Sequence, residues 1–250
     1  MKTGFLITAR MKSTRLPQKV TLKINDREII AWMIDRLKQC RCLDEIIIAT
    51  STNPQDDVLC DIACREKIKY YRGSEDDVLE RLYGAAKEYG LDYAINITAD
   101  CPLVAFDFIE TAIQLYGKSD ADLITNYNLP HGFYFWGIKI PALGKVLKIK
   151  NDTNTEIWGR YFTDTGLFKV IDMEIPVEFQ RENYRLTLDY PDDYEFFKAL
   201  FNKLGPDTYK KSTRSIIYFL DKNPEIAGIN AHCKALYKKR WNKQNKIVLK

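Results

Sequence analysis

The chain has 250 residues, of which 46% are hydrophobic and 29% charged, and its formal net charge at pH 7 is +4. This is the composition of a globular protein with one well-buried core, which excludes mainly disordered, collagen-like and disulfide-scaffold proteins. No apolar run approaches the roughly 20 residues of a membrane span, and the run after Lys2 stops at Arg10, too early for a secretory signal. We expect a cytoplasmic protein without a membrane span, whose six cysteines are reduced thiols rather than zinc ligands.

The positive charge is concentrated at the C-terminus. Residues 234–250 contain seven Lys or Arg residues and no acidic residue, so the rest of the chain is slightly acidic. We interpret residues 1–236 as a single domain and 237–250 as a basic C-terminal tail, most simply a solvated terminal helix. No aromatic platform or RNA-binding motif accompanies these charges, so no nucleic-acid partner is expected.

Short apolar strands alternate with amphipathic helices through the first half of the chain. Strands are predicted at 4–9, 45–50, 69–72, 92–98 and 122–126, and helices at 29–40, 54–65, 75–89 and 106–116. The run Ile46-Ile47-Ile48-Ala49 is apolar throughout, which favours a strand buried on both faces. This alternation predicts βαβ units and so an α/β fold, a mostly parallel, Rossmann-like sheet with helices on both faces.

The second half changes in character. Residues 127–185 are rich in aromatic side chains and are predicted to form a small mixed β/α excursion that covers one side of the sheet. A returning strand is predicted at 185–188, and helices at 191–204, 212–220 and about 223–239. Ligands of parallel sheets bind beyond the carboxyl ends of the strands. The candidate loops are therefore those after Ala9, Thr50, Arg72, Thr98 and Asn126.

The loop after the first strand is the strongest functional signal. Residues 9–19 read Ala-Arg-Met-Lys-Ser-Thr-Arg-Leu-Pro-Gln-Lys, with four cations and two hydroxyl groups. The pattern matches neither a Walker A loop nor GxGxxG. Its position, however, is that of the phosphate-binding loop of a doubly wound sheet, where Arg and Lys side chains can hold a triphosphate. The structural alternative is a solvated basic loop.

Two acidic residues follow apolar strands in similar contexts. Asp100 stands in Thr-Ala-Asp-Cys-Pro and Asp189 in Leu-Asp-Tyr-Pro. Mg²⁺ takes one or two carboxylates together with substrate phosphates, so this pair could hold it. A turn cap is the alternative for Asp100, whereas Asp192 and Asp193 are ordinary acids of a first helical turn.

These motifs, in this order and spacing, resemble the cytidylyltransferases that activate acidic sugars. Within that group they are most similar to the spore-coat polysaccharide type, and also to the CMP-Kdo and CMP-sialate synthetases. The segment Arg72-Gly73-Ser74-Glu75-Asp76-Asp77 belongs to the same pattern, and the resemblance covers about residues 1–205. It implies a GT-A-like nucleotidyltransferase fold and CTP as substrate. A hydroxyl of a sugar, expected to be an acidic one, would attack the α-phosphate and release pyrophosphate, in cell-surface glycan precursor synthesis.

The resemblance also implies roles for individual residues. The expected catalytic residues are Arg10, Arg15, Lys19 and Asp100. The expected nucleotide-binding residues are Ala9, Arg10, Ser13, Thr14, Arg15, Lys19, Thr50, Gly73, Ser74 and Asp100. Asp100 and Asp189 are the expected ligands of a Mg²⁺ cofactor, and a homodimer is expected because family members often dimerise through the excursion.

One segment departs from the family pattern. Many relatives carry Asp-Gly-x-Asp-x-Glu where residues 131–139 are aromatic and neutral to basic, so the acceptor cannot be carried over. The expected acceptor-binding residues are Asn126, His131, Lys139 and Arg185, and apolar packing is the alternative for the aromatic ones.

Three other functions compete with this one. A GT-A glycosyltransferase would use a finished nucleotide sugar, but it usually has Asp-x-Asp where this chain has Ala99-Asp100-Cys101. A sugar-1-phosphate nucleotidyltransferase would carry a Gly-rich first loop. A non-catalytic nucleotide-binding protein is the third alternative, and release of pyrophosphate distinguishes it from the enzyme.

Overall fold

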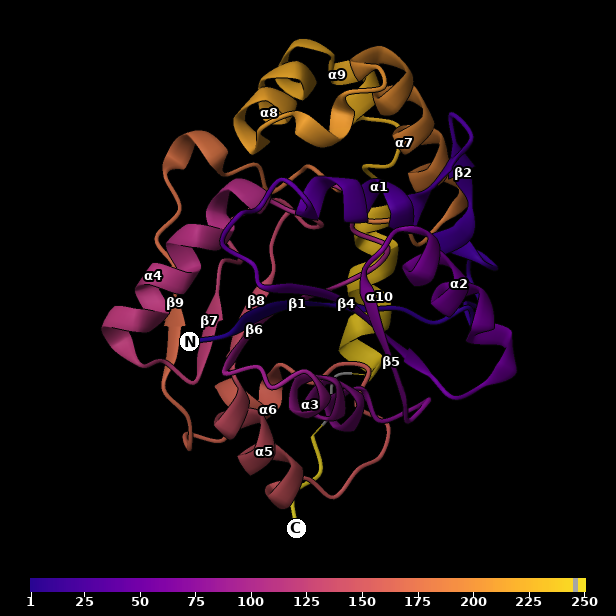
Figure 1. Cartoon of the computed structure of the whole chain (residues 1–250). Coiled ribbons are helices and arrows are strands. Elements are labelled where there is room, and N and C mark those ends of the chain that lie inside the picture. Colours follow the sequence, from indigo (N-terminus) through magenta and orange to yellow (C-terminus); the bar gives the residue numbers. More distant parts are fainter. Residues whose placement is uncertain (245–246) are drawn as a thin grey trace.

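The computed structural model describes residues 1–244 and 247–250 of the chain. Within them the backbone forms a seven-stranded sheet, in the order β5-β4-β1-β6-β8-β7-β9, and a separate two-stranded ribbon of β2 and β3. Helices lie on both sides of the sheet (Figure 1). This confirms the predicted α/β architecture with a mostly parallel sheet.

The parallel part of the sheet consists of β1 (Thr3–Thr8), β4 (Glu45–Ser51), β5 (Lys69–Gly73) and β6 (Tyr93–Thr98). β1 lies between β4 and β6, with Leu6 in register with Ile47 and Asn96. Leu6 and Ile47 are fully buried, because helices cover this part of the sheet on both faces. The four strands end at the same edge of the sheet, where the loops that follow them gather.

The other strands of the sheet are β7 (Leu123–Thr125), β8 (Trp136–Lys139) and β9 (Val170–Asp172). β8 runs antiparallel to both of its neighbours, β6 and β7, and β9 runs parallel to β7. The segment 127–185 therefore adds two strands to the main sheet in addition to covering it.

Two hydrophobic clusters fill the spaces on the two sides of the sheet. The first contains Phe5 and Ile7 of β1. Its helices are α1 (Ile29–Leu37), α2 (Asp57–Arg65), α4 (Ile109–Ser119), α7 (Pro191–Leu204) and α8 (Thr213–Lys222). The second contains Leu6 and packs against α3 (Val78–Glu88), α5 (Ile140–Ile149) and α6 (Arg160–Thr163). Successive residues of β1 thus face opposite layers, as the pleat of a strand requires.

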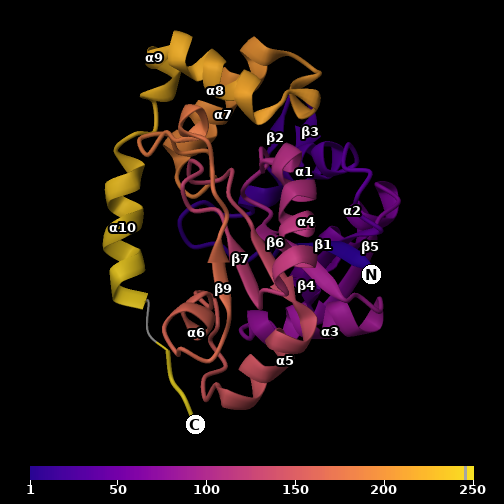
Figure 2. The ribbon, with the colours of Figure 1, turned by 90° about the vertical axis from the view of Figure 1, so that its left-hand side faces the viewer.

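The last helices lead the chain away from the sheet and back again. After α9 (Pro224–Ala227), α10 (Cys233–Gln244) runs beside the layers toward α6 (Figure 2). Beyond it, the backbone N–H of Asn151 donates to the carbonyl of Val248 at 2.8 Å, and Leu249 forms an antiparallel bridge with Lys150. The boundary that we placed at residue 236 falls inside α10, because this helix continues from Cys233 without a break.

Short elements complete the fold. They are β2 (Lys23–Ile24), β3 (Arg27–Glu28) and the 3₁₀ helices η1 (Lys19–Thr21), η2 (Pro54–Asp56), η3 (Phe106–Phe108), η4 (Val177–Phe179) and η5 (Thr208–Lys210). Across the described residues, no helix has the length and apolar character needed to cross a lipid bilayer.

Several predicted elements differ from the structure in regularity or in their ends, among them the helices predicted at 54–65 and 106–116, each of which begins as a 3₁₀ helix. The predicted strand at 185–188 is an extended segment with one isolated parallel bridge, between Arg185 and His131. The helix predicted from residue 75 begins at Val78, because the Asp77 side chain caps it by accepting from the N–H of Glu80 at 3.1 Å. The helix predicted over 223–239 is divided into α9 and α10 by turns at 228–232.

Candidate active site

The basic loop and the strand-end acids line one cavity of about 310 Å³ at the carboxyl edge of the sheet. Seven of the ten expected nucleotide-binding residues line it: Ala9, Arg10, Ser13, Thr14, Arg15, Lys19 and Asp100. Thr50, Gly73 and Ser74 do not line it. Thr50 is the last residue but one of β4, Gly73 ends the neighbouring strand β5, and the Ser74 carbonyl accepts from Arg81.

Lys19 joins the two carboxylates that the sequence singled out. Its Nζ donates to Asp100 Oδ2 and, at 2.8 Å, to Asp189 Oδ1. Burial works against the Lys19 ammonium, but attraction to Asp100 and Asp189 outweighs it and raises the pKa of Lys19. The side chain therefore stays charged at neutral pH, and the carboxylates from two distant segments share one cation.

Asp189 is held by cations on both of its oxygens. Arg15 donates to Oδ1 beside Lys19, and Arg185 Nη2 lies 2.8 Å from Oδ2. Burial alone would raise the pKa of the Asp189 carboxyl, but the three cations outweigh it and hold this pKa well below its usual range. Asp189 is thus a carboxylate at any pH near neutrality.

Asp193 fixes the position of Asp189 through the backbone. Its Oδ2 accepts from the N–H of Asp189 at 2.8 Å and from the N–H of Tyr190 at 3.0 Å, and it completes a capping box at the start of α7. Its Oδ1 accepts from Arg185 Nε at 2.9 Å and from Asn230 Nδ2 at 2.8 Å. For Asp193 the capping interpretation is confirmed, and the cap also orients the neighbouring site carboxylate.

Asp100 is placed by the end of β6. The hydroxyl of Thr98 donates to Asp100 Oδ1, and the Asp100 carbonyl accepts from the N–H of Leu188 at 2.8 Å. The extended segment before Asp189 therefore lies directly alongside Asp100. Asp100 follows the end of a strand, and the segment that leads into Asp189 is hydrogen-bonded to its carbonyl. Asp100 and Asp189 therefore meet although they are 89 positions apart in the chain.

The donor set fits a divalent cation. Two carboxylates lie within hydrogen-bond distance of a single ammonium group, so a second positive charge at this place would meet oxygen ligands of the kind that Mg²⁺ prefers. Lys19 and Arg15 occupy Asp189 Oδ1, so coordination there would require these cations to turn toward the phosphates of a ligand. The metal assignment of Asp100 and Asp189 stays a prediction.

Arg81 is a site residue that sequence reasoning missed. It is fully buried on α3, its Nη1 donates to the carbonyl of Glu75 at 3.1 Å, and it lines the cavity that contains the basic loop. Among the described residues, its Nε and Nη2 have no hydrogen-bond partner. Burial, and then the nearby positive charge of Arg10, lower the pKa of Arg81 to about 10, so it remains a cation at neutral pH. The sequence contained one signal that could have identified Arg81 as a site residue: it is a charged residue on the apolar face of a helix predicted to be amphipathic.

The four expected acceptor residues have different surroundings. Lys139 is a correction: it pairs in register with Tyr93 at the opposite edge of the sheet and binds Asp120 at 2.7 Å. Because β8 is antiparallel to β6, its last residue lies roughly 15–20 Å of strand away from the carboxyl edge. Asn126 is buried and its Oδ1 accepts from the N–H of Phe135 at 2.9 Å, so it closes a turn. Arg185 contacts the carboxylates of Asp189 and Asp193, and neither Asn126 nor Arg185 lines a described cavity.

His131 lies between aromatic rings and one guanidinium. Its ring stacks on Tyr134, at 5.2 Å between centroids, and contacts Tyr237 at 4.7 Å. Its Nδ1 lies 3.3 Å from Arg185 Nη1. Burial, and then the positive charge of Arg185, lower the pKa of His131 to about 4. The imidazole is therefore neutral at pH 7 and accepts from Arg185, rather than meeting an anion as a cation.

A second and larger cavity opens beside the first. Its volume is about 910 Å³ and most of its large side chains are aromatic: Tyr127, Tyr134, Trp136, Trp158, Tyr237 and Trp241. A smaller cavity of about 140 Å³, which we call the connecting cavity, shares lining residues with both: Lys19 and Asp100 with the first, and Tyr237 and Trp241 with the second. The site therefore extends from the basic loop, past the two carboxylates, into an aromatic chamber.

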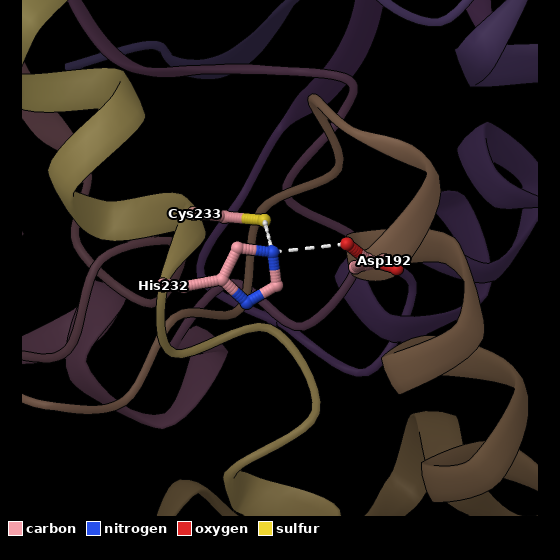
Figure 3. A group of neighbouring side chains, drawn as sticks. All are labelled: Asp192, His232 and Cys233. Atoms are coloured by element: carbon pink, nitrogen blue, oxygen red, sulfur yellow. Dashed lines mark hydrogen bonds and ion pairs between the residues drawn. The ribbon is translucent and has the colours of Figure 1, made fainter.

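The start of α10 is attached to the segment that carries Asp189. His232 Nε2 lies 3.0 Å from Asp192 Oδ2 and 3.6 Å from the sulfur of Cys233, so the three side chains converge (Figure 3). Burial raises the pKa of the Cys233 thiol to about 11, so the thiol is neutral at pH 7. We interpret the group as a polar contact between α7 and α10, because the Asp–His pair is exposed and each contact is satisfied without a metal.

The sequence and the fold were compared with those of known proteins, and both comparisons lead to one family. The sequence model of a family described as Cytidylyltransferase matches residues 5–223. The chain is 34% identical over 234 residues to the uncharacterized protein MJ1063 of Methanocaldococcus jannaschii, with 93% of this chain and 96% of that protein covered. It is 31% identical over 232 residues to the spore coat polysaccharide biosynthesis protein SpsF of Bacillus subtilis, with 89% and 95% covered.

Two solved structures share the fold. A cytidylyltransferase from Leptospira borgpetersenii superposes with a TM-score of 0.83 at 29% identity, covering 91% of this chain and 97% of that one. A CMP:2-keto-3-deoxy-manno-octonic acid synthetase complexed with CTP gives a TM-score of 0.63 at 15% identity, covering 82% and 100%, and shows the fold alone. The family match includes the basic loop and both carboxylates. The chain belongs to the cytidylyltransferase family of nucleotidyltransferases.

Proposed function

We propose that the protein transfers CMP from CTP to a hydroxyl group of an acidic sugar and releases pyrophosphate. The observation that carries this proposal is the convergence of the basic loop and the two carboxylates on one cavity. Arg10, Arg15 and Lys19 bring three positive charges to it, and a triphosphate has about four negative ones, which they partly balance. The proposed acceptor class is supported by a relative named 3-deoxy-manno-octulosonate cytidylyltransferase, from Chloroherpeton thalassium, which is 26% identical over 183 residues.

In the proposed reaction the side chains position and neutralise rather than form covalent bonds. Lys19 and Arg15, now bound to Asp189, would turn toward the β- and γ-phosphates and stabilise the charge that grows on pyrophosphate as it leaves. Asp100 and Asp189 would then be free to hold Mg²⁺, which would supply charge neutralisation at the α-phosphate. Arg185 would keep Asp189 in place throughout.

The base is proposed to be cytosine because of the family. Thr50, Gly73 and Ser74 remain proposed contacts on the nucleoside side, where β4 and β5 end next to each other. A GT-A glycosyltransferase is not favoured, because the strand-end segment has a single Asp and the chain belongs to a nucleotidyltransferase family. We further propose, from the resemblance alone, a cytoplasmic homodimer. Light scattering on a sizing column tests the assembly.

The first experiment is thermal unfolding with CTP, UTP, GTP and ATP, each with Mg²⁺ and with EDTA. A ligand that binds only the folded state, at about 100 times its dissociation constant, adds about 2.7 kcal/mol of stability. We expect selective stabilisation by CTP that EDTA reduces. Stabilisation by another triphosphate would change the proposed base, and stabilisation only by a nucleotide diphosphate sugar would favour the glycosyltransferase.

The second experiment measures pyrophosphate release from CTP with 3-deoxy-manno-octulosonic acid, N-acetylneuraminic acid and glucuronic acid as acceptors. Release that depends on both the acceptor and Mg²⁺ supports the proposal. Binding of CTP with no release for any sugar acid would exclude this acceptor class.

A further inference from the structure

Helix α10 contributes side chains to the lining of the aromatic chamber. Three of the four tryptophans of the chain line it, namely Trp136, Trp158 and Trp241. Trp241 is 38% exposed and Tyr127 is 48% exposed, so two of the ring systems present faces to solvent inside a concavity. Concave sites with aromatic walls and a few polar groups are typical of small-molecule binding. The volume of about 910 Å³ is at the upper end of the usual range for such sites.

The cations at the chamber's rim are only partly paired. Arg160 binds Asp164, and Arg240, which lines the two neighbouring cavities, binds Glu156 of the chamber, so these charges are compensated. Within the described part of the chain, Lys238 forms no ion pair, although it lines the chamber. An uncompensated ammonium beside exposed ring faces favours a ligand that has an apolar face and a negative charge.

Helix α10 connects this chamber to the reacting end of the site. Tyr237 contacts His131 at 4.7 Å and lies under the Arg185 guanidinium at 5.3 Å, and Arg185 holds Asp189. Asn230, just before the helix, donates to the Arg185 carbonyl at 3.0 Å. α10 is therefore placed by the same buried groups that place the carboxylate, and its position relative to the basic loop is defined.

The same helix lies outside the part of the chain that the family model covers. That match ends at residue 223, whereas α10 begins at Cys233. Features shared by the family account for the basic loop and the carboxylates. The rings and charges of α10 lie outside the matched segment.

We propose that α10 is one wall of the acceptor site, where Trp241 packs against the apolar face of the acceptor and Lys238 binds its carboxylate. This inference rests on the proposed nucleotidyl transfer and extends it. The basic C-terminal segment would then be a specificity element, and its charge would select an anionic acceptor. An acceptor in the chamber would have its hydroxyl directed toward Lys19 and Asp100 through the connecting cavity.

The test uses two variants and two matched controls on the same helix. The variants are Trp241→Ala and Lys238→Ala. The controls are Leu236→Ala and Lys239→Ala, at exposed positions of α10 that do not line the chamber. The probes are 3-deoxy-manno-octulosonic acid, N-acetylneuraminic acid and glucuronic acid, with glucose as the neutral partner of glucuronic acid. Binding is followed by tryptophan fluorescence and by calorimetry, in the presence of CMP and Mg²⁺.

We expect at least one sugar acid to bind, glucose to bind more weakly than glucuronic acid, and both variants to weaken binding about tenfold or more. The controls should bind like the wild-type protein, and all five proteins should bind CTP equally. Equal binding by variants and controls, or no binding by any sugar acid, would overturn this inference. If CTP itself fails to stabilise the wild-type protein, the proposed function fails instead, so the two failures are distinguishable.

Discussion

Lys19 Nζ lies 2.8 Å from Asp189 Oδ1, although 170 residues separate them in the chain, and the same ammonium donates to Asp100. One cation thus joins the first loop of the sheet, the end of its β6 strand and the segment that leads into α7. Because a buried charge needs partners of opposite sign, removing Lys19 takes from Asp100 the ammonium that it binds, whereas Asp189 keeps Arg15 and Arg185. The basic loop and the two carboxylates of the proposed site therefore depend on each other for their positions.

The first prediction concerns this cation. We expect Lys19→Met to lower the rate of pyrophosphate release at least about 10²-fold, because the developing charge on the leaving group loses a fixed cation. The measurement is kcat and KM for CTP at saturating Mg²⁺. The control is Lys198→Ala, which removes an exposed Lys paired with Glu195 on α7 and should leave both constants unchanged. Turnover by Lys19→Met within threefold of wild type would remove Lys19 from the proposed mechanism.

The second prediction concerns the buried guanidinium behind Asp189. Arg185 is 1% exposed and contacts both Asp189 and Asp193. We expect Arg185→Met to destabilise the fold by about 3–5 kcal/mol, because buried Asp193 loses the cation that it binds and Asp189 loses one of its three. Urea unfolding measures the change. As a control, Arg214→Met removes an exposed cation paired with Glu178 and should cost less than about 1 kcal/mol.

Equal losses for the two Arg variants would show that Arg185 is not needed to compensate these acids. A large stability loss with Arg185→Lys as well would indicate that the forked geometry matters besides the charge, since Lys cannot donate to both carboxylates in the same way.

The third prediction concerns pH. The pKa of His131 is lowered to about 4 in the folded protein, whereas an unfolded His has a pKa of about 6.5. Between these values the unfolded chain binds more protons, so stability falls as the pH is lowered from 6.5 toward 4. Relative to His131→Gln, the wild-type protein should lose about 2 kcal/mol more between pH 7 and pH 4.5. Urea unfolding at the two pH values provides the measurement.

Parallel losses in the wild-type protein and the His131→Gln variant would contradict a neutral, buried His131. The depressed pKa of Asp189 acts in the same direction, chiefly below the pKa of about 3.9 of an unfolded Asp, and it does so in both proteins, so it does not produce the difference at pH 4.5.

The sequence predicted the central part of the site because parallel strands carry their ends to one edge. Asp100 and the basic loop follow strands β6 and β1, which are neighbours in the sheet, so their convergence follows from the strand pattern. Lys139 was misplaced for a related reason. No strand was predicted over 136–139, and the strand found there runs antiparallel to β6, which carries Lys139 to the opposite edge of the sheet.

Other features depend on packing between distant segments. The placement of α10 against the site depends on Asn230 and Tyr237 meeting Arg185, and no local pattern in the basic tail indicates such contacts. The unpaired N–H groups of Arg81 likewise result from where α3 lies against the basic loop. Sequence periodicity predicts which face of a helix is buried, but not which site that face borders.

The last prediction concerns the turn that carries His131. Gly132 has φ of +102°, and an added Cβ would lie 2.1 Å from the carbonyl oxygen of Leu186. Leu186 itself donates its N–H to the His131 carbonyl at 2.6 Å, so the turn and the segment before Asp189 are in direct contact. We expect Gly132→Ala to destabilise the protein by at least about 1–3 kcal/mol and to lower activity, because the displaced segment positions Asp189.

The matched control for this substitution is Gly117→Ala. Gly117 lies inside α4 with nothing within 4 Å of an added Cβ, so the change should be neutral or stabilising by up to about 1 kcal/mol. Urea unfolding and pyrophosphate release are measured on both variants. If Gly132→Ala behaves like Gly117→Ala in both assays, the turn can relax without moving Asp189, and the close packing of residues 131–132 against the Asp189 segment is not a requirement for the site.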